Sequence, residues 1–193
     1  LDPSGIIPDG SVTSSYNGMF NVSCYDSANG EITAMASGGT GVIECSIDGA
    51  IFHPNPHVFS GLSAGPHTIT YRNTSGGCDT TETLILTKPP ALSGALSITQ
   101  GVVCFGVCDG EIEFTVDGTQ VGVPSYQYSI NNGINFQNST EFLTLCGNST
   151  YDVIIKDLNS CLYTSSIYLP APNSLSYSLS ITDYNNFEIS CNG

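Results

Sequence analysis

The chain has 193 residues, a length that accommodates one large domain or two small ones. Its formal charge of −14 argues against nucleic acid as a partner, because a phosphate backbone is bound by a basic footprint, and it disfavours an anionic membrane surface. With 40% hydrophobic and only 10% charged residues, the chain does not have the profile of a disordered acidic tail. There is no apolar run long enough to predict membrane insertion.

An internal repeat organises the chain. One pattern, Pro, two residues, Ile or Leu, four residues, then Ser-Val/Ile-Thr, starts at Pro3, Pro89 and Pro172. Further motifs follow each copy in the same order, so we expect repeats of roughly 80 residues. The expected organisation is a junction from a preceding repeat (1–10), a first repeat (11–91), a second repeat (92–174) and the first strand of a third (175–193).

The predicted elements are strands throughout. In chain order, apolar residues alternate with polar ones over 67–71, 112–116, 126–130 and 151–155, the period of a half-buried strand. Turn-forming clusters separate these runs, and no stretch of ten residues has a helical period. About six or seven short strands in roughly 80 residues predict an all-β fold of tandem Ig-like β-sandwich modules.

Eight cysteines without a CxxC pair indicate disulfides formed in an oxidising, extracellular setting. In a sketch of six strands running alternately up and down, the first turn and the last hairpin turn of a repeat lie at the same end. We therefore expect Cys24–Cys78 and Cys104–Cys161 bonds within the repeats, where a closed loop of roughly 54 residues contributes about 4 kcal/mol. A Cys78–Cys104 bond, which would join far ends of neighbouring repeats, is the less favoured alternative.

Of the remaining cysteines, three occur in only one of the two repeats, and Cys191 repeats the position of Cys24. Cys45 occupies a core-facing strand position and is expected to be a buried thiol. Cys108 and Cys146 are candidates for an additional pair in the second repeat, although the strand sketch places them at opposite ends. Cys191 is expected to find its partner in the remainder of the third repeat.

The ordered motifs resemble the SprB-type repeat of surface adhesins in gliding Bacteroidetes. Nearly the whole chain is covered, and the order of the motifs is more specific than any one of them. In the first repeat the motifs are Val22-Ser23-Cys24, Asn29-Gly30-Glu31-Ile32, Gly38-Gly39-Thr40-Gly41, Phe59 to Gly65, Gly76-Gly77-Cys78 and Pro89-Pro90-Ala91-Leu92.

The resemblance implies a non-catalytic stalk segment of a large adhesin, exported by the type IX system of a Gram-negative bacterium to the outer surface and used in adhesion or gliding motility. Its expected partners are neighbouring repeats of the same polypeptide, with surface polysaccharide or other adhesin chains as further candidates. Family hosts carry O-glycans at Asp-Ser/Thr sites, which makes Ser27 and Thr80 candidate positions. The alternatives are a fibre subunit that exchanges the strand 179–190, and a carbohydrate-binding module of a secreted enzyme.

Two patterns suggest chemistry, and each has a structural interpretation that we favour. Gly61 to Gly65 spells the G-x-S-x-G of a nucleophile elbow, but strands rather than a helix follow, so we expect a β-turn. His53 and His57 are four residues apart, but Pro54 and Pro56 exclude the helix that would align them for zinc.

No cofactor is expected, with a structural Ca²⁺ as the one candidate. Asp26 with Asn29, or Asp109 with Glu111, could supply oxygen ligands from a loop. Solvated turn residues are the default interpretation of both pairs, and His67 is expected at the edge of the core. We expect no enzyme activity.

Overall fold

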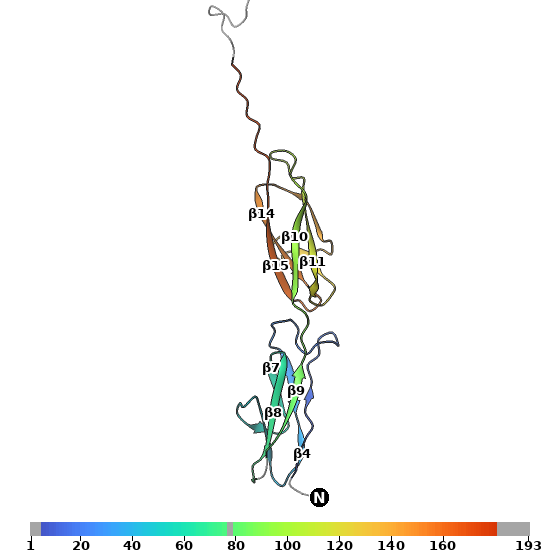
Figure 1. Cartoon of the computed structure of the whole chain (residues 1–193), viewed down its shortest axis with the longest axis vertical. Coiled ribbons are helices and arrows are strands. Elements are labelled where there is room, and N and C mark those ends of the chain that lie inside the picture. The colour runs from blue at the N-terminus through green and yellow to red at the C-terminus, as the bar shows by residue number, and fades with distance from the viewer. Residues whose placement is uncertain (1–4, 77–78, 181–193) are drawn as a thin grey trace, which may run out of the picture.

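The computed structural model describes residues 5–76 and 79–180, which form strands and loops with no helix among them. Two β-sandwiches are stacked end to end along the long axis, with the connection near residue 90 (Figure 1). The prediction of tandem all-β, Ig-like modules is confirmed. Within the described part of the chain there is no helix of the length and apolarity needed to cross a membrane.

The first sandwich contains nine strands in three sheets. Strands β2, β3 and β7 form one sheet in the order β2-β3-β7, and the facing sheet has the order β6-β5-β8-β9, while β1 pairs with β4 alone. All these pairings are antiparallel. The strands are β1 (Ile6–Pro8), β2 (Ser11–Val12), β3 (Gly30–Ala34), β4 (Ala36–Gly38), β5 (Ile43–Ile47), β6 (His53–Pro54), β7 (His57–Leu62), β8 (Gly65–Asn73) and β9 (Thr80–Leu86).

The second sandwich has two three-stranded sheets, ordered β10-β11-β13 and β12-β14-β15. The long pair β10 and β11 runs in register from Ile98–Ile112 to Gly94–Val116. The strands are β10 (Leu92–Gln100), β11 (Gly110–Val121), β12 (Gln127–Ser129), β13 (Glu141–Leu145), β14 (Ser149–Lys156) and β15 (Leu162–Leu169).

Each module has its own core, built from the alternating residues. In the first, Ile69 and Tyr71 of β8 are fully buried beside Ile32 of β3, and in the second, Phe114 and Val153 are fully buried. The period of two places every second side chain inside, and burying an Ile or Phe stabilises by about 1.5–3 kcal/mol. The two cores share no residue.

At both ends of the chain the structure differs from the expected repeat boundaries. Residues 6–8, expected to belong to a junction, form β1 and pair with residues 36–38 of β4, so they are part of the first sandwich. At the other end, residues 175–180 form no strand and extend away from the second sandwich with fully or largely exposed side chains (Figure 1). The rest of the expected third-repeat strand lies outside the described residues.

Candidate functional site: the inter-module junction

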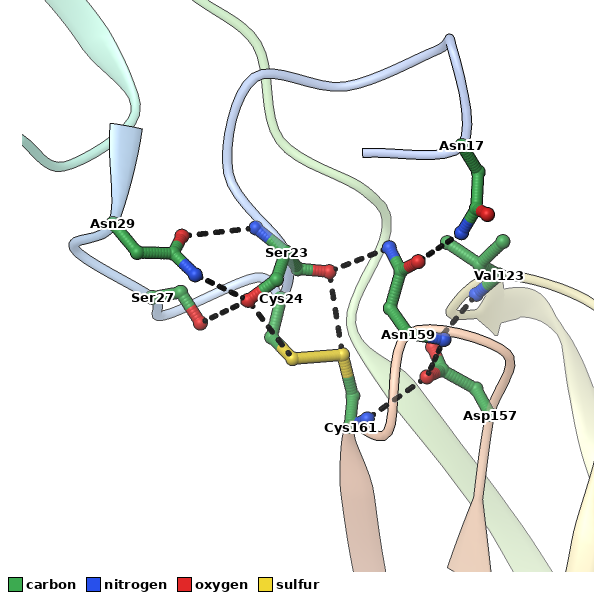
Figure 2. The surroundings of a disulfide bond; sticks show 9 residues. All are labelled: Asn17, Ser23, Cys24, Ser27, Asn29, Val123, Asp157, Asn159 and Cys161. Atoms are coloured by element: carbon green, nitrogen blue, oxygen red, sulfur yellow. Dashed lines mark hydrogen bonds between the residues drawn. A yellow bond between two sulfur atoms is a disulfide. The ribbon is translucent and has the colours of Figure 1, made fainter. Parts of the chain in front are cut away.

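One side of the junction is the loop of residues 20–29, which we call the junction loop. A turn closes it, in which Ser27 N–H donates to Cys24 O at 3.1 Å. Ser23 is held from both sides, because its N–H donates to Asn29 Oδ1 at 3.0 Å and its hydroxyl oxygen accepts from Asn29 Nδ2 at 2.8 Å. These bonds fix the backbone on either side of the cysteine and turn its side chain toward the next module (Figure 2).

The junction loop is tied to the end of the first sandwich. Asn21 Oδ1 accepts the N–H of Thr87 at 2.9 Å, and Thr87 O accepts the N–H groups of Asn21 and Val22. Val22 is fully buried. The loop therefore lies where β9 ends and the linker to the second module begins.

The other side of the junction is the hairpin turn of residues 157–161, between β14 and β15. Asp157 is 3% exposed, and its Oδ1 accepts the N–H groups of Asn159 and Cys161, each at 2.9 Å. Its Oδ2 accepts Val123 N–H at 2.9 Å. A buried carboxylate is costly unless hydrogen bonds replace its water, and these three N–H groups do so while shaping the turn that presents Cys161.

A disulfide joins the two sides. Cys24 of the first module is bonded to Cys161 of the second, with their Cα atoms 5.7 Å apart (Figure 2). Asn159 Nδ2 donates to Ser23 O at 2.8 Å, and Asn17 Nδ2 donates to Asn159 Oδ1, so the amide of Asn159 links two segments of the first module. The junction is therefore covalent and also hydrogen-bonded.

The linker leaves little freedom around this bond. Pro89 is fully buried, and Lys88 Nζ lies 3.4 Å from the centre of the Tyr25 ring, a cation–π contact across the junction loop. Two consecutive prolines restrict the backbone to extended conformations. A hollow of about 330 Å³ beside the disulfide is lined by residues 24–27, 90–92 and 161–162.

The predicted pairings Cys24–Cys78 and Cys104–Cys161 are wrong, since Cys24 is bonded to Cys161. The physical reason is the short strand β6, which reverses the chain between β5 and β7 and gives the first module seven strand directions rather than six. With seven strand directions, the β8–β9 hairpin turn lies at the opposite end of the sandwich from the junction loop. Cys78 itself lies outside the described residues.

The other cysteines divide into a confirmed pair and free thiols. Cys108 and Cys146 are bonded, which confirms them as a pair within the second module. The sketch separated them, but the pairing of Gly110 with Leu145 brings their two loops together at one end. Cys45 is a fully buried free thiol as predicted, and burial raises its pKa. Cys104 is free and exposed, while Cys191 lies outside the described residues.

The histidines take structural positions. The rings of His53 and His57 are stacked 4.0 Å apart, and both meet the edge or face of Phe59. His67 is buried, with Nδ1 at 2.6 Å from Asp48 Oδ2 and Nε2 at 2.8 Å from Ser63 O. Ser63 lies in the two-residue connection that leads from β7 of one sheet to β8 of the other, and a strand rather than a helix follows it.

The candidate cation ligands and glycan sites lie in loops or at the starts of strands. Among the described residues no group of three or more His, Cys, Asp or Glu side chains converges on a metal-sized space. Asp109 Oδ1 accepts the N–H of Val103 in its own loop at 3.2 Å, and Asn29 accepts a backbone N–H of its loop in the same way. Ser27 is half-buried beside Ser23, Thr80 is half-buried at the start of β9, and O-glycosylation of both stays a prediction.

Sequence reasoning identified Asn159 only as a turn residue, and it missed Asp157 and Asn17. Their counterparts in the other repeat are different residues; for example Thr74 and Gly76 occupy the positions of Asp157 and Asn159. A search for shared motifs therefore passes over them. The one available signal was the clustering of Asp, Asn, Ser and Cys within the turn 157–161.

Comparison with known proteins supports the resemblance. The SprB repeat model matches residues 20–49 and 96–135, one segment in each repeat, and this confirms the resemblance expected from the motifs. The SprB repeat is a structural module and not an enzyme family. No curated protein matches the chain.

Several solved structures of multi-domain chains are similar at low identity. Three N-terminal domains of the bacteriophage RB49 outer capsid protein Hoc share 16% identity at a TM-score of 0.41, over 82% of this chain and 58% of that one. The C-terminal fragment of intimin, solved with the intimin-binding domain of Tir, shares 12% identity at a TM-score of 0.34, over 83% of this chain and 64% of the intimin fragment. Titin domains A168–A170 share 14% identity at a TM-score of 0.32, over 86% of this chain and 67% of the titin chain. The chain spans less than two thirds of the first two.

Proposed function

We propose that this chain is a segment of the stalk of a large cell-surface adhesin, in which the modules transmit tension. The observation that carries the proposal is the Cys24–Cys161 bond, which crosses from one sandwich to the next. A bond in this place holds two modules in line and carries load past the residues between the cysteines. A ligand-binding module would not need it.

Three further features support a stalk. The SprB repeat model matches one segment of each module, and this match supports a cell-surface adhesin as the parent protein. The two sandwiches are stacked end to end rather than side by side (Figure 1). The charge of −14 keeps an extended surface filament soluble and self-repelling. Export by the type IX system, attachment to a Gram-negative outer membrane and a role in gliding are part of the same proposal.

Two measurements on source cells test the proposal. Antibodies against the 193-residue chain should label intact cells away from the outer membrane, and the polypeptide isolated without proteolysis should have a mass far above 20.2 kDa. The purified chain should fail to compete with cells for their adhesion substrate, because the binding site lies elsewhere. A native mass near 20.2 kDa, or strong competition by the purified chain, would contradict the stalk.

A further inference from the structure

The far end of the second module carries a second copy of the junction loop. In residues 100–109, which we call the counterpart loop, Val107 N–H donates to Cys104 O at 3.2 Å, the same turn as the one from Ser27 to Cys24. Asp109 Oδ1 accepts Val103 N–H at 3.2 Å, as Asn29 Oδ1 accepts Ser23 N–H. The two loops therefore hold their cysteines on the same backbone framework.

The packing beneath the two loops also matches. A Cβ on Gly30 would strike Leu86 and the backbone oxygen of Leu62. A Cβ on Gly110 would meet the corresponding groups, Leu169 and the backbone oxygen of Leu145. Each glycine lets the loop approach the end of its sandwich closely, so the loops sit in the same place on the two modules.

The two loops differ in whether another module covers them. Cys24 is bonded to the second module, whereas Cys104 is free and exposed. Next to Cys104, Val103 is 67% and Phe105 59% exposed, and Leu175, the counterpart of the half-buried Leu92, is 100% exposed.

Beside the counterpart loop lies a hollow of about 540 Å³, lined by residues 103–105 and 172–175. These are the counterparts of the junction loop and the proline linker that line the hollow at Cys24. The surface is more apolar than its covered counterpart, because Ser23 and Ser27 are replaced by Val103 and Val107. Exposed apolar patches of this kind mark interaction sites.

We propose that this surface receives the last hairpin turn of a following module, and that Cys104 forms a disulfide with the cysteine of that turn. The occupant is the counterpart of residues 157–161, because that turn covers the equivalent surface on the first module. In the reaction two thiols become one disulfide, releasing two protons and two electrons to the thiol-oxidising machinery of the extracellular compartment.

The consequence is a chain of overlapping covalent rings. Cys104 lies between Cys24 and Cys161 in sequence, so a ring that starts at Cys104 begins inside the first ring. Consecutive rings would then interlock along the stalk, and no junction would depend on the peptide linker alone. This deepens the proposed stalk function and rests on it for its biological meaning, but the pairing is tested on the protein alone.

The test uses the full chain lengthened by one additional copy of residues 92–174, inserted directly after residue 174. The added copy carries Cys104→Ser, so that one Cys104 remains, and Leu162→Val at an exposed position, so that its Cys161 peptide differs in mass. The oxidised protein is blocked with iodoacetamide, digested without reductant and mapped by mass spectrometry. The matched control carries Cys104→Ser in the first copy as well.

The expected result is a Cys104 peptide bonded to the marked Cys161 peptide, with Cys24 bonded to the unmarked one. Alkylated Cys104 beside an intact Cys24–Cys161 bond would overturn the inference and leave the stalk proposal untouched. So would a bond from Cys104 to the unmarked Cys161. If the lengthened chain does not fold, the polypeptide isolated from its source with thiols blocked decides: Cys104 must be absent from the alkylated fraction, and its recovery there overturns the pairing.

Discussion

Cys24 and Cys161 are 137 residues apart in sequence, yet their Cα atoms lie 5.7 Å apart. One residue belongs to the first sandwich and the other to the second, so their bond closes a covalent ring that contains most of both cores. Cross-linking a loop of this length restricts the unfolded chain by about 5 kcal/mol in the chain-entropy model. The mechanical and thermodynamic behaviour of the two modules should therefore be coupled.

Pulling the chain from its two ends should reveal the ring. Force passes through the disulfide, so the residues between Cys24 and Cys161 stay folded or unfold without adding length. The Cys24→Ser, Cys161→Ser double variant should release roughly 330 Å of additional contour length, at about 3.3–3.6 Å per residue, because the remaining Cys108–Cys146 bond keeps 38 of the 137 residues from extending. Single-molecule force spectroscopy measures this, and an equal contour length in both proteins would contradict the ring.

The same double variant should loosen the angle between the modules. Hydrogen bonds from Asn159 and Asn17 remain, but each such bond contributes only about 0.5–1.5 kcal/mol. Small-angle X-ray scattering should show a broader distribution of maximum dimensions than in the native chain. The control is Cys108→Ser with Cys146→Ser, which removes a bond inside one module and should leave the distribution unchanged.

Replacing Asp157 should impair formation of the junction bond. Asp157→Ala leaves three backbone N–H groups without their acceptor, at a cost of about 1–3 kcal/mol for each that stays buried. We expect a less stable second module and more alkylated Cys161 after oxidative refolding. Asp157→Asn keeps one oxygen acceptor and should be intermediate, and full Cys24–Cys161 bonding in Asp157→Ala would contradict this role of the carboxylate.

The His67–Asp48 pair should make the first module slightly less stable at alkaline pH. Burial lowers the pKa of His67, but hydrogen bonds to Ser63 O and Asp48 outweigh it and raise the pKa above its ordinary value of 6.5. The folded state thus holds the proton more tightly, and this stability, present below pH 6.5, is lost as the pH rises through the folded pKa. Burial raises the pKa of Asp48, but hydrogen bonds from His67 and Thr68 lower it overall, so its contribution is lost only in acid.

Thermal unfolding between pH 6 and 9 checks this. Because the Asp48 side chain is 48% exposed, the pair contributes at most about 1 kcal/mol, or a few degrees in Tm. The pKa of His57 is lowered by burial and by His53, so its effect on stability with rising pH is opposite to that of His67. The control is therefore Asp48→Asn, which changes the His67 pair and leaves His53 and His57 intact. An equal pH slope in both proteins would contradict the role of the pair.

Tyr71 should stabilise the first module through Glu82. Its hydroxyl donates to Glu82 Oε1 at 2.5 Å, and Gly10 N–H donates to the same oxygen at 3.0 Å. Burial and the neighbouring carboxylate raise the pKa of Tyr71 far above its usual range, so the hydroxyl remains a donor. Tyr71→Phe should lower the unfolding free energy by about 1.5–3 kcal/mol, measured by denaturant titration. Tyr177→Phe, at a 93% exposed tyrosine, should have no effect.

The fold could be predicted from the sequence because its signal is local. The alternation of Ile69 and Tyr71 in one module, and of Ile112 and Phe114 in the other, marks core-facing strand positions, and all four are fully buried. The repeat then follows from comparing the chain with itself. Neither step requires knowing how strands are connected in space.

The disulfide pairing could not be predicted, because it depends on the number of reversals. The strand β6 contains two residues, His53 and Pro54, and has no period that a pattern could detect. Missing it moved the last hairpin turn to the wrong end of the sandwich. The junction contacts of Asp157 and Asn159 were hidden for a different reason, since the equivalent positions of the first repeat hold Thr74 and Gly76, which have different side chains.

The most direct test of the covalent junction is a map of the disulfides in the 193-residue chain, digested without reductant after the free thiols are blocked. The structure predicts one peptide pair that joins Cys24 to Cys161, a second that joins Cys108 to Cys146, and alkylated Cys104. A peptide pair that joins Cys24 to Cys78 would contradict the junction. The modules would then be closed individually, and the linker prolines alone would hold them in line.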